Sequence, residues 1–396
     1  MAKDDAKDAV KLPQLIALSD YCPPPMPTEH AFRATWAKLK RRLAAHEAPL
    51  LHTSGLDPAS LASIPAFQAS PQWDPMLEAL DAQFGEWAND ESADARLRAI
   101  VIPPCDTTEM LTTWAHARGH ALLHEPSRFA LANLALDGVL QSLQGDGLLV
   151  IPRLEKWFLR DRNGLHAVRS LIAQLATSGR RCLVGCDSWA WRFLVKAADV
   201  DLALSNPQTL EPFDARRLCE WFTTLARDAD GVTTTFRLAG NGYDVLACNE
   251  NGDPHNAYLR QLAARSGGIP WVAWHLWRAG LRLSAGEKPL SDRAVKATAG
   301  DARTVWIIDV ADVSLPPTNV DRSLLVLQAL LIHGGLTAAE VEAVLPTTGE
   351  PNMLVALTHS GHLQRSNGSA LYRIQPAAYP AIRQALKAAG LPTGVV

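Results

Sequence analysis

The residues best placed for chemistry lie in a short turn, Pro104–Glu109, between an apolar run and a helical pattern. The run Ala99–Ile102 has the length of a strand, and the helix after the turn extends to Gly119. In nucleotide-binding proteins such a turn holds phosphates with backbone N–H groups of glycines and with a lysine. This turn has neither glycine nor lysine, and Asp106 and Glu109 would repel an anion. It therefore indicates a nucleotide-binding scaffold that has lost ordinary triphosphate binding.

A second motif has changed in the same way. Leu148–Ile151 is an apolar run typical of a strand buried on both faces of a parallel sheet. In an active ATPase with this order of elements, the next two residues are acidic, hold magnesium and polarise the attacking water. Here they are Pro152 and Arg153, and the nearest acid, Glu155, is displaced. We therefore predict no catalytic residue, no metal site and no required cofactor. Weak binding of ATP or ADP is still compatible with the positive end of the helix.

Some polar residues at these strand ends have a structural alternative. Thr107 or Thr108 is suited to cap the first helix, with Glu109 in its first turn. Asp187 follows another apolar run, at the place where ATPases of this kind carry a sensor residue. Asp187 is also suited to N-cap the helix that follows, and we favour the capping role.

Apolar runs that alternate with helical patterns predict a right-handed parallel α/β sheet, with Asp201–Ser205 as its fifth strand. Val232–Leu238 and Tyr243–Cys248 flank Asn241-Gly242, a pair typical of a β-hairpin turn. Four regions are expected: a helical N-terminal region at 1–95, a P-loop NTPase-like α/β core at 96–210, a helical lid with a small hairpin at 211–317, and a winged-helix domain at 318–396.

The clearest pattern in the sequence is that of a winged helix in residues 318–396. Three helical patterns precede a hairpin that turns at Asn367-Gly368, and a closing helix follows. The expected helices are Asp321–Ile332, Thr337–Val344, Asn352–His359 and Tyr379–Ala389, and the hairpin is Leu363–Ile374.

The order of these elements resembles AAA+/STAND-type ATPases, in particular archaeal-type replication initiators and related ATPases with an appended winged helix. The resemblance covers roughly residues 95–390. Gly267-Gly-Ile-Pro270 is similar to the sensor-2 region of such lids, which would make Arg278 a sensor arginine. The resemblance implies vestigial nucleotide-site positions at Thr107, Thr108, Glu109, Asp187 and Arg278.

We predict a pseudo-ATPase that serves as an adaptor or regulator through contacts with a protein partner. One alternative is a winged-helix DNA-binding regulator or replication-initiator-like factor, and another is an NTPase with an unorthodox site. Residues 320–396 carry five basic and four acidic side chains, fewer cations than a DNA reader normally needs. Candidate contacts to DNA or a partner are Asn352, His359, Arg365 and Arg373. A basic helix face adds Lys38, Arg41 and Arg42 as candidate partner contacts.

The composition excludes several classes of function. The chain has 396 residues and a net charge of −3, so no global attraction to nucleic acid or acidic membranes is expected. No apolar run is long enough to span a membrane, and the first residues lack the apolar region of a signal peptide, so a cytoplasmic location is expected. The six cysteines are scattered and are expected to be reduced thiols. No oligomeric state follows from the sequence.

Overall fold

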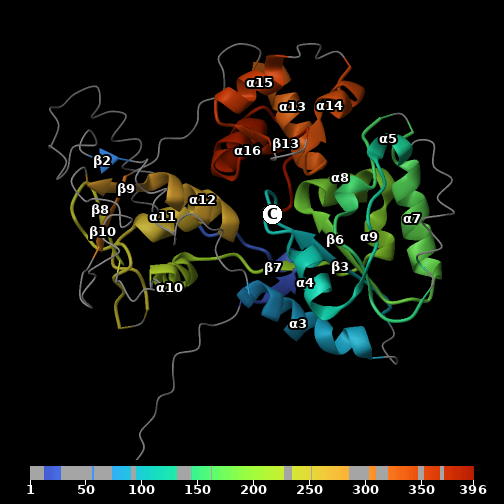
Figure 1. Cartoon of the computed structure of the whole chain (residues 1–396), viewed down its shortest axis with the longest axis horizontal. Helices are drawn as coiled ribbons and strands as arrows, with labels where there is room; N and C mark the ends of the chain where they lie inside the picture. The colour runs from blue at the N-terminus through green and yellow to red at the C-terminus, as the bar shows by residue number, and fades with distance from the viewer. Residues whose placement is uncertain are drawn as a thin grey trace, which may run out of the picture. The chain divides into compact units, whose positions relative to one another are not determined.

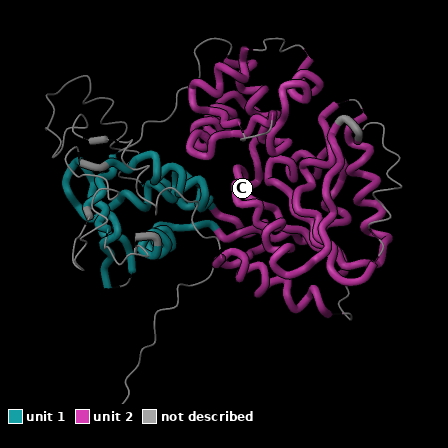
Figure 2. The backbone as a smooth tube through the Cα atoms, viewed as in Figure 1, with its two compact units in different colours: residues 1–11, 23–72, 212–311 teal, residues 12–22, 73–211, 312–396 magenta. Residues whose placement is uncertain are grey.

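The computed structural model describes residues 13–27, 56–57, 74–90, 95–131, 143, 145–161, 163–226, 234–250, 252–284, 303–308, 320–346, 352–365 and 370–396. The chain forms two compact units (Figure 2). Unit 1 comprises residues 1–11, 23–72 and 212–311, and unit 2 comprises residues 12–22, 73–211 and 312–396. The predicted boundaries at 95, 210 and 317 stay a prediction. Among the described residues, no helix has both the length and the apolar character that crossing a bilayer requires.

Unit 2 is built on a six-stranded sheet in the order β1-β7-β3-β6-β5-β4 (Figure 1). All neighbouring strands are parallel except β1, which pairs antiparallel with β7 at the edge. The parallel pairing confirms the predicted parallel α/β fold. The strand β3, which precedes the turn at Pro104–Glu109 (called the altered turn below), lies in the middle of the sheet. The strands are β1 (Leu15–Ala17), β3 (Leu97–Ile102), β4 (Ala121–Leu122), β5 (Leu149–Ile151), β6 (Cys182–Asp187) and β7 (Gln208–Leu210).

Helices cover this sheet and bury its apolar strands. Ile100, Val150 and Leu183 are completely buried, as is Trp114 of the helix after the altered turn. The helices are α3 (Asp74–Asn89), α4 (Met110–Arg118), α5 (Arg128–Leu131), α7 (His166–Thr177), α8 (Ser188–Ala198), α9 (Val200–Ala203) and the 3-10 turn η5 (Leu154–Lys156).

The predicted strand at Asp201–Ser205 is wrong. Val200–Ala203 forms the short helix α9, whose Asp201 and Leu202 are exposed. The fifth parallel strand is instead β7 (Gln208–Leu210), where Thr209 and Leu210 are buried. A run of four or five residues fits a short strand and one helical turn equally well, so only the pairing with β3 decides between them.

Unit 1 packs helices against a four-stranded sheet in the order β2-β9-β10-β8. Trp271, Trp274 and Trp277 are all buried and form part of its core. At the predicted hairpin Asn241-Gly242, the antiparallel pairing is limited to one bridge, between Arg237 and Asp244, and β8 also pairs in parallel with β10. The elements are β2 (Leu56–Asp57), β8 (Thr234–Leu238), β9 (Leu281–Ser284), β10 (Arg303–Ile307), α10 (Ala215–Ala226), α11 (Tyr258–Ser266) and α12 (Pro270–Gly280).

Residues 320–396 form what we call the C-terminal module, which belongs to unit 2. Its strands pair antiparallel in the order β11-β13-β12. The predicted helices are all present, and Thr337 caps the second one in a capping box with Glu340. The elements are α13 (Val320–Ile332), β11 (Leu336–Thr337), α14 (Ala338–Val344), α15 (Asn352–His359), β12 (Leu363–Arg365), β13 (Leu371–Ile374) and α16 (Tyr379–Ala388).

Candidate functional site

The altered turn between β3 and α4 is held together by Asp106. One oxygen of this buried carboxylate accepts hydrogen bonds from the backbone N–H and the hydroxyl of Thr108, both at 2.7 Å. The other accepts from the backbone N–H of Met110 at 3.4 Å, where α4 begins. The predicted cap by Thr107 or Thr108 is therefore wrong, and Glu109 precedes the helix rather than entering its first turn. The Asp106 carboxylate therefore accepts hydrogen bonds from backbone N–H groups at the start of the helix, the kind of group that binds phosphate in other proteins.

The turn also adopts the backbone that glycine would favour, although it contains none. Cys105 and Glu109 have φ values of 64° and 49°, in the left-handed region that costs a non-glycine residue energy. The hydrogen bonds to Asp106 at the centre of the turn offset this cost. The missing glycines alone therefore do not exclude a wrapped turn, and the Asp106 carboxylate lies at the centre of this one.

Arg153 is the second of the two residues after β5 at which acids are expected from the order of elements. It is buried, with its guanidinium 3.7 Å from the Asp106 carboxylate and 3.6 Å from the Glu155 carboxylate. It also donates a hydrogen bond to the backbone oxygen of Asp106 at 3.3 Å. Burial opposes its charge, but Glu155 and then Asp106 outweigh burial, so the pKa of Arg153 is raised. A protein cation thus lies between the two buried carboxylates of Asp106 and Glu155.

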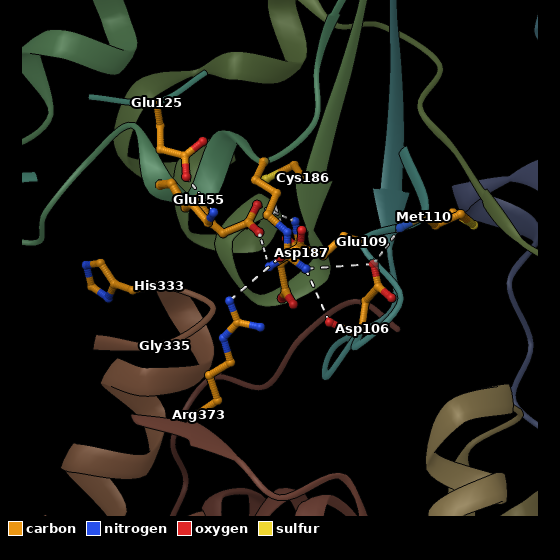
Figure 3. A network of polar contacts seen from close by, with 12 residues as sticks. Asp106, Glu109, Met110, Glu125, Glu155, Cys186, Asp187, His333, Gly335 and Arg373 are labelled. Carbon is orange, nitrogen blue, oxygen red and sulfur yellow. Dashed lines mark hydrogen bonds and ion pairs between the residues drawn. The ribbon is translucent and has the colours of Figure 1, made fainter. Parts of the chain in front are cut away.

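Asp187 ends β6 beside this ion pair. Its carboxylate accepts a hydrogen bond from the backbone N–H of Trp189 at 2.8 Å, which confirms the predicted N-cap of α8. Its own N–H donates to Glu155 at 3.0 Å. Loss of hydration and the nearby Glu155 charge raise the pKa of Asp187 well above its ordinary value. Figure 3 shows Glu155, Asp187 and Asp106 close together; they come from η5, the end of β6 and the turn after β3.

The C-terminal module is fastened to this region by Arg128 of α5. The buried Arg128 guanidinium donates to the backbone oxygens of Gly335 at 2.8 Å and Glu155 at 3.1 Å, and also to that of His333. It lies 3.7 Å from the carboxylate of Glu340. One side chain therefore connects η5 with the residues that follow α13 and with α14.

His333 adds a second connection. Its Nε2 accepts from the backbone N–H of Arg160 at 3.0 Å, and its Nδ1 donates to the backbone oxygen of Ala329 at 2.8 Å. Burial and the nearby Arg128 lower the pKa of His333 to about 3, so the ring is neutral near pH 7. These interactions fix the neutral ring in the tautomer with its proton on Nδ1.

Arg373 of β13 completes the enclosure from the C-terminal module. Its guanidinium lies 3.9 Å from the carboxylate of Glu109 and points toward the acidic residues in Figure 3. Burial and then Arg153 lower its pKa. The space that remains is a cavity of only about 30 Å³. Its lining includes Cys105, Asp106, Thr107, Arg153, Asp187, Gly334 and Arg373.

Within unit 2, the predicted contact residues Asn352, His359 and Arg365 are not among the residues that line this cavity. Arg278 is exposed at the end of α12 in unit 1. Asn352 and His359 are exposed at the two ends of α15, and Arg365 is exposed on β12. The candidate contacts Lys38, Arg41 and Arg42 lie outside the described residues.

Several residues that build the site were not singled out from the sequence as its members. Asp106 was noted only as a charge that repels anions, and Arg153 only as a missing acid. Arg128 and His333 carry no local signal. One sequence feature points to the pairing of Arg153 with Asp106. Arg153 directly follows a buried strand, and a buried cation requires acidic partners, which the turn containing Asp106 offers.

The cysteines near this site are held in their neutral form. Burial, followed by nearby acidic charges, raises the pKa values of Cys105 and Cys186 well above the ordinary value, so neither thiol is an activated nucleophile. In the described part of the chain, no group of three or more metal-ligating side chains has a geometry that could hold an ion.

The raised pKa of Asp187 predicts how stability depends on pH. Since the folded value exceeds the unfolded one, this carboxyl contributes stability at low pH that is lost as pH rises through the folded value. Asp187→Asn keeps the cap and removes the charge. As pH rises from 4 to 8, the free energy of unfolding of the variant should increase relative to wild type. The expected increase is about 1.4 kcal/mol for each unit by which folding raises the pKa of Asp187. Urea unfolding at both pH values measures it, with the exposed Asp201→Asn as control. Equal pH dependence in wild type and Asp187→Asn would contradict it.

Comparison with known proteins gives distant structural similarity only. No family model and no curated protein sequence matches the chain. Among solved structures, it is similar to the Thermotoga maritima RuvB Holliday junction branch migration motor, at 14% identity and TM-score 0.32 over 83% of this chain and 99% of that one. It is also similar to Drosophila ORC bound to DNA, at 12% and 0.29 over 91% and 100%. A third similar structure is the Aeropyrum pernix ORC2 protein in ADPNP–ADP complexes. Its sequence identity is 10% and its TM-score is 0.24, over 94% of this chain and 97% of that one.

Proposed function

We propose that this protein is a catalytically degenerate AAA+/STAND-like scaffold that acts through protein contacts as an adaptor or regulator. The observation that supports this most strongly is the size of the space at the altered turn. A cavity of about 30 Å³ remains there, whereas sites for small molecules and cofactors enclose about 300–1,000 Å³. It has room for about one or two waters and none for a nucleoside triphosphate.

The chemistry of the lining supports the same proposal. A triphosphate would have to displace the Asp106 carboxylate from the N–H groups of Thr108 and Met110. A magnesium ion would have to replace the buried Arg153 between Asp106 and Glu155. Each exchange breaks a charge-assisted contact in a buried region, which is costly. The scaffold therefore keeps its shape without a nucleotide.

The charge of the C-terminal module favours a protein partner over DNA. Of its five basic residues, Arg373 is half-buried and faces Glu109. The exposed arginine of the strand pair β12–β13 is Arg365. The five basic side chains of the module are nearly balanced by its four acidic ones, so we expect DNA binding to be weak and to change little with salt. Sub-micromolar binding to duplex DNA near physiological salt, abolished by Arg365→Ala, would favour the DNA-binding alternative.

The experiment that tests this proposal is nucleotide turnover and binding by the purified full-length protein. We expect no hydrolysis of ATP or GTP above the blank with magnesium present. We also expect no change in Tm with 1 mM Mg·ATP. A site with a Kd of about 10 µM would stabilise the protein by about 2.7 kcal/mol at that concentration, which thermal unfolding detects easily.

Glu155→Gln is the matched control for a trace of contaminating ATPase. This variant keeps an acceptor for the N–H of Asp187 and removes the acid nearest to the catalytic position. Turnover that persists unchanged in Glu155→Gln comes from a contaminant. Magnesium-dependent turnover that disappears in Glu155→Gln would overturn the proposal in favour of an NTPase with an unorthodox site.

A further inference from the structure

Two cysteines of unit 1 lie in direct contact. Cys219 is on α10 and is 2% exposed, while Cys248 is half-buried in the segment after β8. Their sulfur atoms are 2.6 Å apart, although the residues are 29 positions apart in sequence. A disulfide bond is about 2.05 Å long, so bond formation needs the sulfurs to approach by only about 0.6 Å.

The backbone around both cysteines is fixed. The turn after Cys248 closes with hydrogen bonds from the N–H of Asn249 to the oxygen of Asp253 at 2.9 Å and from the N–H of His255 to the oxygen of Ala247 at 3.0 Å. On α10, the Thr223 hydroxyl donates to the backbone oxygen of Cys219 at 2.7 Å. Both sulfurs also contact the backbone oxygen of Leu246, at 3.5 and 3.6 Å. The two thiols are therefore held together without a covalent bond.

We propose that Cys219 and Cys248 form a reversible oxidation site that takes a hydroperoxide, such as hydrogen peroxide, as its co-reactant. The Cys248 thiolate attacks one peroxide oxygen, so an S–O bond forms, the O–O bond breaks and water leaves after protonation. The sulfur of Cys219 then attacks the sulfur of Cys248. The S–S bond forms, the S–O bond breaks, and the proton of Cys219 leaves with the hydroxide as a second water. One peroxide is reduced and two thiols are oxidised.

The surroundings assign the two roles. Cys248 is the more accessible sulfur, so it meets the oxidant first. Burial, followed by the hydrogen bond with Cys248, raises the pKa of Cys219 to about 12, so Cys219 stays a thiol until it resolves the intermediate. A thiol reductant such as dithiothreitol reverses the reaction. The bond would link α10 covalently to the turn after β8.

The test oxidises the full-length protein with hydrogen peroxide, blocks free thiols with iodoacetamide under denaturing conditions and measures the intact mass. The chain has six cysteines, so we expect four alkylated thiols after oxidation and six after reduction. Peptide mapping without reduction should identify the Cys219–Cys248 link. The Tm should rise on oxidation by on the order of 5–10 °C and return with dithiothreitol.

Variants separate this pair from the other thiols. Cys22→Ala removes an exposed thiol of unit 2 and should still lose two alkylation sites on oxidation. Cys219→Ala and Cys248→Ala should form no internal link and show no rise in Tm. Six alkylated thiols in oxidised wild type, or a link between any other pair of cysteines, would overturn the proposal. Mapping of the wild-type chain decides the question even where a variant fails to fold.

Discussion

Arg128→Met is expected to release the C-terminal module from the sheet and to lower the free energy of unfolding by about 3–5 kcal/mol. The Arg128 side chain is 7% exposed. It donates hydrogen bonds to three backbone oxygens and forms an ion pair with Glu340. Methionine fills much of the same volume but donates nothing, so these acceptors are left buried without their donor. Urea unfolding measures the loss. Hydrogen exchange across residues 333–340 should accelerate, because the contact fixing them to the sheet is gone.

Lys387→Met is the matched control for loss of a cation from the same module. Lys387 is exposed on α16, and removal of an exposed charge changes stability by less than about 1 kcal/mol. Similar stability for Arg128→Met and Lys387→Met would show that Arg128 does not fasten the module. Unchanged exchange at 333–340 in a destabilised Arg128→Met would place the loss elsewhere.

Arg153→Met should cost about 3–5 kcal/mol for a different reason. It leaves the carboxylates of Asp106 and Glu155 buried without the cation that lies 3.6–3.7 Å from each. Breaking such a pair is costly because the remaining charge is not hydrated. The loss should shrink as pH falls, since the carboxyl groups left behind then take up protons. Urea unfolding at pH 4 and pH 7 measures both effects.

A second substitution tests whether the charge is the cause. Arg153→Met combined with Glu155→Gln removes one of the two acids and keeps an oxygen for the N–H of Asp187. This double variant should recover part of the stability lost in Arg153→Met, because neutral buried groups often replace ion pairs at little cost. A double variant as unstable as the sum of its single changes would instead indicate that Arg153 acts by packing alone.

The sequence by itself determined most helices and the character of the altered site. Helices α13, α14, α15 and α16 begin and end within about two residues of their predicted limits, because their apolar spacing is a local signal. The N-cap at Asp187 was predictable for the same reason, since its partner is only two residues away. The absence of lysine and glycine from the turn at Pro104–Glu109, and of acids at Pro152-Arg153, is also read directly from the sequence.

Only the tertiary structure decided where the short strands lie and what fills the site. A three-residue strand such as β7 has too few residues for its period to show, so its pairing with β3 defined it. Likewise, the local pattern did not show that β8 pairs in parallel with β10, a strand far along the chain. Asp106 meets Arg153 because β3 and β5 end at the same edge of one sheet. Arg128 meets Gly335 across 207 positions of the chain. Local patterns describe neighbours within about a turn, whereas these buried charges find partners only when the chain has folded.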